Sequence, residues 1–128
     1  VKVEVATVTS TNDVQQTMTS LAAKVDAIYL PTDNTVASTA STIGEILQEA
    51  KVPAMGSDAA VIDATLFTYG VDYHAIGVQA GELAVKILKG DKPADLPVEK
   101  PNTAAVTVNE EMATALGFDA ETIKALEK

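Results

Sequence analysis

The sequence contains no cysteine and no tryptophan, and its only histidine is His74. The lack of cysteine excludes disulfide bonds, thiol nucleophiles and thiolate metal sites together. One histidine cannot form a multi-histidine metal site, and no partner for a histidine relay is evident. No Gly-rich turn follows the first predicted strand, which argues against a dinucleotide-binding fingerprint. We therefore expect no enzyme activity, no metal and no cofactor.

Long apolar runs and net positive charge are also absent. The apolar stretches are far shorter than the roughly 20 residues of a membrane span. The formal net charge of −9 repels nucleic-acid phosphate and anionic lipid, so we expect neither as a partner. The chain opens on Val1 without a Met or a charged-then-apolar leader, which we interpret as a processed product or a piece of a longer protein.

The composition is that of a globular domain, with 47% hydrophobic and 21% charged residues over 128 positions. Apolar periodicity predicts strands over 1–8, 26–30, 52–56, 65–69, 96–99 and 104–108. It predicts helices over 14–25, 36–50, 73–89, 110–116 and 120–126, with a short helical stretch over 59–64. Gly70 is expected to end the fourth strand. This alternation predicts a doubly wound, mainly parallel α/β sheet with helices on both faces.

Polar residues follow each of the first three predicted strands. Ligands of open parallel sheets bind outside the carboxyl ends of the strands, where helix N-termini point outward. The candidate ligand-binding residues are Ser10 and Asn12 after the first strand, Thr32, Asp33 and Asn34 after the second, Ser57 and Asp58 after the third, and Tyr69 at the end of the fourth. The loop residues also fit helix caps and turns, and Tyr69 also fits the core. Their convergence at one sheet edge favours a small-molecule site in which the acids bind a cationic group.

Several other residues have structural interpretations. His74 is expected on the surface or half-buried, and Tyr73 is assigned to packing. Gly77 and Gly81 lie four positions apart on the helix over 73–89, so they allow another helix or strand to approach closely.

Five segments resemble the carboxyl-side lobe of ABC transporter substrate-binding proteins. They are 12–16, 20–38, 69–73, 76–77 and 84–90, and the run VDAIYLPTDNT over 25–35 is the most specific. The resemblance extends from Val1 to about Gly117. Within the family, it is most specific to the group associated with tryptophan or tyrosine uptake.

This resemblance implies a single periplasmic-binding-protein-like, flavodoxin-like lobe over 1–128, with the amino-side lobe missing. It implies an extracytoplasmic protein, located in the periplasm or lipid-anchored outside the cell membrane. The resemblance also implies that the protein delivers a small-molecule ligand to a membrane permease, and the family suggests that this ligand is an amino acid. It places ligand contacts on the eight candidate residues above, with Thr32, Asp33 and Asn34 foremost. In this family the helix corresponding to 73–89 packs on the other lobe. Here we expect it to fold back on its own sheet or to swap into a second copy, giving a homodimer.

The alternative is a flavodoxin-like electron carrier that binds FMN. The run over 9–12 resembles a flavin-phosphate loop, and the acidic charge fits. Five aromatic residues and no tryptophan, however, leave little to sandwich an isoalloxazine ring. A signal-receiver domain fits less well, because Val8, Thr9 and Ser10 stand where its acidic pair is expected.

Overall fold

The computed structural model describes residues 1–101 and 104–127. The helices are α1 (Thr11–Ala22), α2 (Asn34–Ala37), α3 (Ala40–Ala50), α4 (Tyr73–Leu88), α5 (Glu110–Leu116) and α6 (Ala120–Lys124). The strands are β1 (Ile28–Leu30), β2 (Ala54–Gly56), β3 (Phe67–Val71) and β4 (Ala104–Val108), and 3-10 turns lie at η1 (Ala59–Ala64), η2 (Pro93–Asp95) and η3 (Ala125–Glu127). Within the described ranges, no helix has the length and apolarity needed to cross a membrane.

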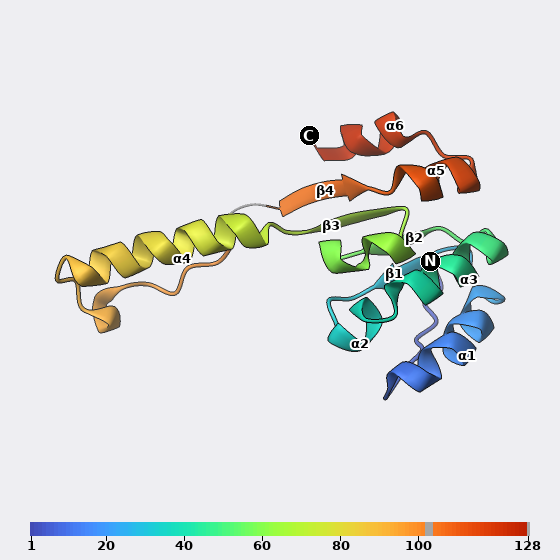
Figure 1. Ribbon diagram of the computed structural model, residues 1–128, viewed down its shortest axis with the longest axis horizontal. Coiled ribbons are helices and arrows are strands. Elements are labelled where there is room, and N and C mark those ends of the chain that lie inside the picture. The colour runs from blue at the N-terminus through green and yellow to red at the C-terminus, as the bar shows by residue number, and fades with distance from the viewer. Residues whose placement is uncertain (102–103, 128) are drawn as a thin grey trace.

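The four strands form one sheet in the order β1-β2-β3-β4 (Figure 1). β1, β2 and β3 are parallel, and β4 joins β3 in the antiparallel sense. The register places Leu30, Gly56 and Thr68 side by side, so the chain leaves all three parallel strands at the same edge. The predicted α/β class with a mainly parallel sheet is confirmed.

The main core lies between the sheet and the helices α1 and α3. Its fully buried members include Ile43 and Leu47, which are four positions apart on α3 and therefore share a face. Ile28 and Leu30 of β1 face this core, because alternate strand residues point the same way. A smaller cluster of Leu66, Ala113 and Ile123 attaches α5 and α6 to the other end of the sheet. Helical and strand periodicity thus predicted the core-facing residues of α1, α3 and β1 correctly.

Two predicted strands do not form. Residues 1–8 take part in no strand, and Val1, Val3 and Val5 are exposed. Residues 96–99 also form no strand; Gln79 of α4 donates instead to the Glu99 carboxylate (2.7 Å) and to the Lys100 carbonyl (3.1 Å). Alternating apolar residues form a strand only when a neighbouring strand pairs with them, and neither segment takes part in a strand pairing.

The single helix predicted over 36–50 is divided into α2 and α3. Ser38 Oγ donates to the Thr35 carbonyl (3.0 Å), and Thr39 Oγ1 donates to the same carbonyl (2.9 Å) and to that of Val36 (3.1 Å). Hydroxyls that bond back to the preceding turn compete with the helical ladder. Thr39, with φ −118° and ψ 14°, leaves the helical conformation, and a new helix begins at Ala40.

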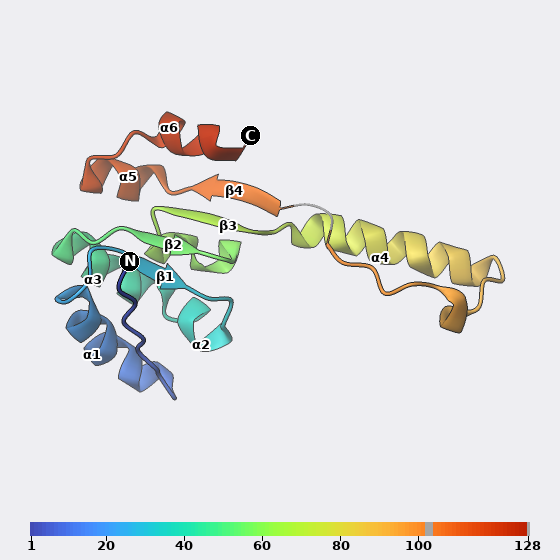
Figure 2. The ribbon, with the colours of Figure 1, turned by 180° about the vertical axis from the view of Figure 1, so that it is seen from behind.

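α4 occupies its predicted span but extends away from the sheet, with the segment after it running back alongside (Figures 1 and 2). None of its residues is buried, so the expectation that it folds back on its own sheet is wrong. A side chain added at Gly77 or Gly81 would meet nothing within 4 Å, so the close approach expected at these glycines does not occur within the chain. The 86% exposure of Leu88 shows that the apolar stripe of α4 has no cover here.

Candidate functional site

Two of the predicted loops meet at the carboxyl edge of the sheet. Thr32 follows β1 and Ser57 follows β2, and their hydroxyl oxygens lie 3.0 Å apart in a hydrogen bond. The Ser57 backbone N–H also donates to the Leu30 carbonyl (3.1 Å), which fastens the second loop to the end of β1. The common strand register brings these two hydroxyls together.

Asp58 stands next to this pair and accepts hydrogen bonds on both carboxylate oxygens. As the N-cap of η1, it accepts from the Ala60 N–H at Oδ1 (2.9 Å). Its Oδ2 accepts from the phenol of Tyr73, the first residue of α4 (3.1 Å). Thr32, Ser57, Asp58 and Tyr73 are hereafter called the strand-end cluster.

The Tyr73 side chain was assigned to packing, and that assignment is wrong. It is 58% exposed, and its phenol binds the Asp58 carboxylate. The hydrogen bond to Asp58, and secondarily the negative charge of that carboxylate, raise the pKa of the Tyr73 phenol. The phenol therefore stays protonated, and remains a hydrogen-bond donor, through the neutral range. The expectation that ligands bind beyond the carboxyl ends of the strands could have found Tyr73, since this residue lies two positions after the end of β3.

Gly70 allows the loop after β2 to cross close to β3. A Cβ at this position would collide with the Ser57 carbonyl oxygen and would lie 2.7 Å from the Ser57 carbonyl carbon. β3 continues through Gly70 to Val71, so the expectation that Gly70 ends the strand is wrong. The absence of a side chain here lets the backbone that carries Ser57 and Asp58 lie against β3.

Asp33 and Asn34 lie next to Thr32 at the start of α2. Asp33 is the N-cap, and its Oδ1 accepts from the N–H groups of Thr35 (2.8 Å) and Val36 (3.0 Å). Asp33 and Asn34 are both exposed. The capping interpretation of Asp33 is therefore correct, and it leaves Oδ2 without a protein partner among the described residues.

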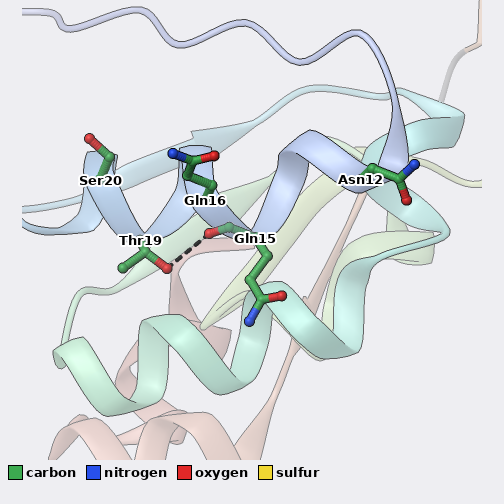
Figure 3. Close-up of a pocket in the computed structure, with 5 residues that line it drawn as sticks. All are labelled: Asn12, Gln15, Gln16, Thr19 and Ser20. Atoms are coloured by element: carbon green, nitrogen blue, oxygen red, sulfur yellow. Dashed lines mark hydrogen bonds between the residues drawn. The ribbon is translucent and has the colours of Figure 1, made fainter.

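Ser10 and Asn12 lie at the start of α1 and have no hydrogen bond to the strand-end cluster. The Asp13 carboxylate accepts from Thr9 Oγ1 (2.8 Å), Ser10 N (3.1 Å) and Ser10 Oγ (3.0 Å). Asn12 lies at one end of a shallow hollow along α1, which Gln15, Gln16, Thr19 and Ser20 also line (Figure 3). All five belong to one helix face, so this hollow is distinct from the strand-end cluster.

Tyr69 lies in β3 and is 51% exposed, which excludes the core interpretation. By alternation it shares a sheet face with Phe67, whereas Thr68 points into the buried side. His74 is exposed at the start of α4, as expected.

The strand-end cluster combines groups that are suited to recognition. It offers one carboxylate and three hydroxyl groups, which can bind an ammonium or a hydroxyl group of a ligand. Over the residues that the structure describes, no three histidine or acidic side chains gather into a metal site.

Comparison with known proteins identifies the family. The model of the ABC transporter substrate-binding protein family matches residues 1–124. The chain therefore belongs to the ABC transporter substrate-binding protein family, as its resemblance implied.

Individual relatives agree with this assignment. The chain is 33% identical over 110 residues to a tyrosine-binding protein of Clostridioides difficile, a match that covers 85% of this chain and 32% of that protein. It is similar to an ABC domain from Streptococcus pneumonia in complex with L-Trp, with TM-score 0.79, 37% identity, and coverage of 97% of this chain and 42% of the other.

A ligand-free, open substrate-binding protein with adhesive properties from Clostridium difficile is also similar, with TM-score 0.72 and 36% identity. That match covers 88% of this chain and 38% of the other. The chain thus spans about a third of the length of the curated relative and about two fifths of the two solved chains.

Proposed function

We propose that this chain is one ligand-binding lobe of a two-lobed substrate-binding protein of an ABC importer, and that its ligand is an amino acid with an aromatic side chain. The strand-end cluster is the observation that carries the proposal, because it gathers Thr32, Ser57 and Asp58 at one sheet edge. The family match supports the transport role, and the relatives that bind tyrosine and L-Trp support the ligand class.

Each part of an amino acid has a plausible partner among the candidate residues. The carboxylates of Asp58 and Asp33 suit the ligand ammonium, and the hydroxyls of Thr32 and Ser57 suit its other polar atoms. Ser10 and Asn12 lie at the N-terminus of a 12-residue helix, which favours a ligand carboxylate. The exposed ring of Tyr69 offers a surface for an aromatic side chain, and Asn34 adds a further amide next to Asp33.

In this proposal the protein binds and releases its ligand without chemical change. The complete protein is extracytoplasmic, in the periplasm or lipid-anchored outside the cell membrane, and passes the ligand to a membrane permease. The family match removes the support for an FMN-binding electron carrier, because that alternative depended on one weakly matching loop.

α4 carries an exposed apolar face that has no packing partner among the described residues. Val78 and Val85 lie seven positions apart on one face and are 52% and 47% exposed. We infer that this face packs on the second lobe in the complete protein. In the isolated chain it associates with a second copy, by a homodimer or a domain swap.

A thermal-shift screen tests the proposed function. The two-lobed protein that contains this chain is mixed with amino acids, sugars and nucleosides, and L-Trp or L-Tyr is expected to raise the unfolding temperature most. Asp33→Asn is expected to reduce that rise, because an asparagine oxygen can still cap α2 but lacks the charge that binds an ammonium.

Asp63→Asn is the matched control, since it removes the same charge from an exposed residue of η1 outside the strand-end cluster. Stabilisation by a sugar or a nucleoside, with no response to any amino acid, would contradict the proposed ligand.

A further inference from the structure

We propose that Tyr73 is a positioning residue of the ligand site, which holds the Asp58 carboxylate in place and offers its phenol oxygen to the ligand ammonium. This proposal rests on the proposed function. Tyr73 lies outside the three loops from which the sequence predicted binding, and it comes from the first turn of α4. Its hydroxyl lies 3.1 Å from Asp58 Oδ2.

The hydrogen bonds at Asp58 fix the orientation of the carboxylate and leave it free acceptor capacity. Oδ1 accepts from the Ala60 N–H and Oδ2 accepts from Tyr73, so each oxygen has one protein donor. An ionised carboxylate has about four lone-pair positions, which leaves acceptor capacity for a ligand. A carboxylate already held in its bound orientation loses less conformational freedom when the ligand arrives.

The backbone on both sides of this bond is also fixed. Gly70 lets the Ser57–Asp58 peptide lie directly against β3, and the Ser57 N–H is bonded to the Leu30 carbonyl. Asp72 caps α4 by accepting from the Ala75 N–H (3.0 Å), which sets the start of the helix that carries Tyr73. The Tyr73–Asp58 distance is therefore determined by the fold on both sides.

The charge of the pair favours a cationic partner. The Tyr73 hydroxyl donates a hydrogen bond to Asp58, so its oxygen keeps lone pairs that can accept from a ligand, and the side chain is exposed. Among the described residues, neither Tyr73 nor Asp58 is paired with a lysine. An ammonium next to both groups finds one full negative charge and one neutral acceptor.

Calorimetry on the two-lobed protein tests this proposal with two probes. L-Trp carries the ammonium, and indole-3-propionate has the same ring and carboxylate without it; the affinity of the second probe is measured by displacement of a bound reporter. Tyr73→Phe is expected to weaken L-Trp binding about three- to tenfold and to leave indole-3-propionate within about twofold. Tyr29→Phe is the control, since Tyr29 is also an exposed tyrosine of the sheet region and is not in the strand-end cluster.

Equal losses for both probes, or no loss for L-Trp, would overturn the role of Tyr73. If the unchanged protein binds neither probe, the proposed function fails and this proposal fails with it, so the two failures are distinguishable.

A second measurement needs no ligand. With tyrosine labelled at the ring carbon that bears the hydroxyl, NMR follows the titration of each phenol in this chain. Asp58→Asn is expected to lower the pKa of Tyr73 toward that of an ordinary tyrosine, because it removes the charge of the hydrogen-bond acceptor. A Tyr73 titration that does not respond to Asp58→Asn would show that the hydrogen bond is absent, and the proposal would fall.

Discussion

Gly70 of β3 and Ser57 of the loop after β2 are in backbone contact, with no room for a side chain between them. A Cβ on residue 70 would also lie 3.2 Å from the Asp58 nitrogen. The contact holds the two polar residues after β2 against the strand that leads to Tyr73. It is therefore a structural condition for the strand-end cluster.

Gly70→Ala is expected to destabilise the chain by about 1–3 kcal/mol, because the loop after β2 must move to admit a methyl group. Urea unfolding measures the change through the midpoint. Gly81→Ala is the control: it lies in the interior of α4, nothing lies within 4 Å, and removal of a helical glycine stabilises by about 0.5–1 kcal/mol. Equal effects of the two substitutions would contradict the contact.

The carboxylate of Asp13, at the start of α1, makes the stability of the fold depend on pH. Hydrogen bonds from the side chains of Thr9 and Ser10 lower the pKa of Asp13 below its usual value of 3.8. A carboxyl group whose pKa is lower in the folded state stabilises the fold above its unfolded pKa, and this contribution is lost as the pH falls through the folded pKa. Asp13→Asn is therefore expected to be less stable than the original chain at neutral pH.

The difference is expected to shrink as the pH falls below 3.8, and urea unfolding at neutral and acid pH measures it. Asp26→Asn, which removes the same charge from an exposed loop residue, is the matched control. A difference for Asp13→Asn that stays constant into the acid range would argue against this role.

The apolar face of α4 is expected to make the isolated chain self-associate. Light scattering on the purified 128-residue chain measures its mass, and a dimer is the expected result. The pair Val85→Glu and Leu88→Glu is expected to restore the monomer, because charges on this face oppose its burial.

The control pair, Ser41→Glu and Gln48→Glu, adds the same charge to exposed positions of α3. A strictly monomeric original chain would refute the association.

The isolated chain is expected to bind an aromatic amino acid only weakly. The strand-end cluster is open to solvent, and a second lobe would supply much of the contact area and desolvation. Calorimetry with L-Trp measures the affinity of this chain against that of the two-lobed protein. Submicromolar binding by the chain alone would be inconsistent with a site that needs a second lobe.

The sequence predicted correctly the ends of helices that are marked by capping residues. Asn109 and Gly117 mark the two ends of α5: Asn109 accepts from the Met112 N–H (2.9 Å), and Gly117 takes φ +79°. The long helix α4 also ends close to its predicted limit, with Gly90 at φ +112° just beyond it. Such caps depend on a few adjacent residues, so sequence alone can place them.

The failures concern features that depend on distant residues. The alternating valines at the start of the chain predict a strand, but a strand also needs an adjacent edge, which the pattern cannot supply. Thr32 and Ser57 were predicted to converge because the parallel-strand rule fixes where the loops leave the sheet. Tyr73 was missed because the prediction took only Tyr69 from the fourth strand and did not extend to the residues that follow it. The bond from Tyr73 to Asp58, which joins residues 15 positions apart, is visible only in the structure.

The pairing of Val71 with Ala104 in the antiparallel β3–β4 register shows that the chain leaves the sheet and returns to it at neighbouring points. Everything between these residues, including α4, is in topological terms a long hairpin loop. A short turn could therefore replace the whole excursion and keep the β3–β4 register. The segment that contains α4 can thus be exchanged at Val71 and Ala104 without redesign of the sheet.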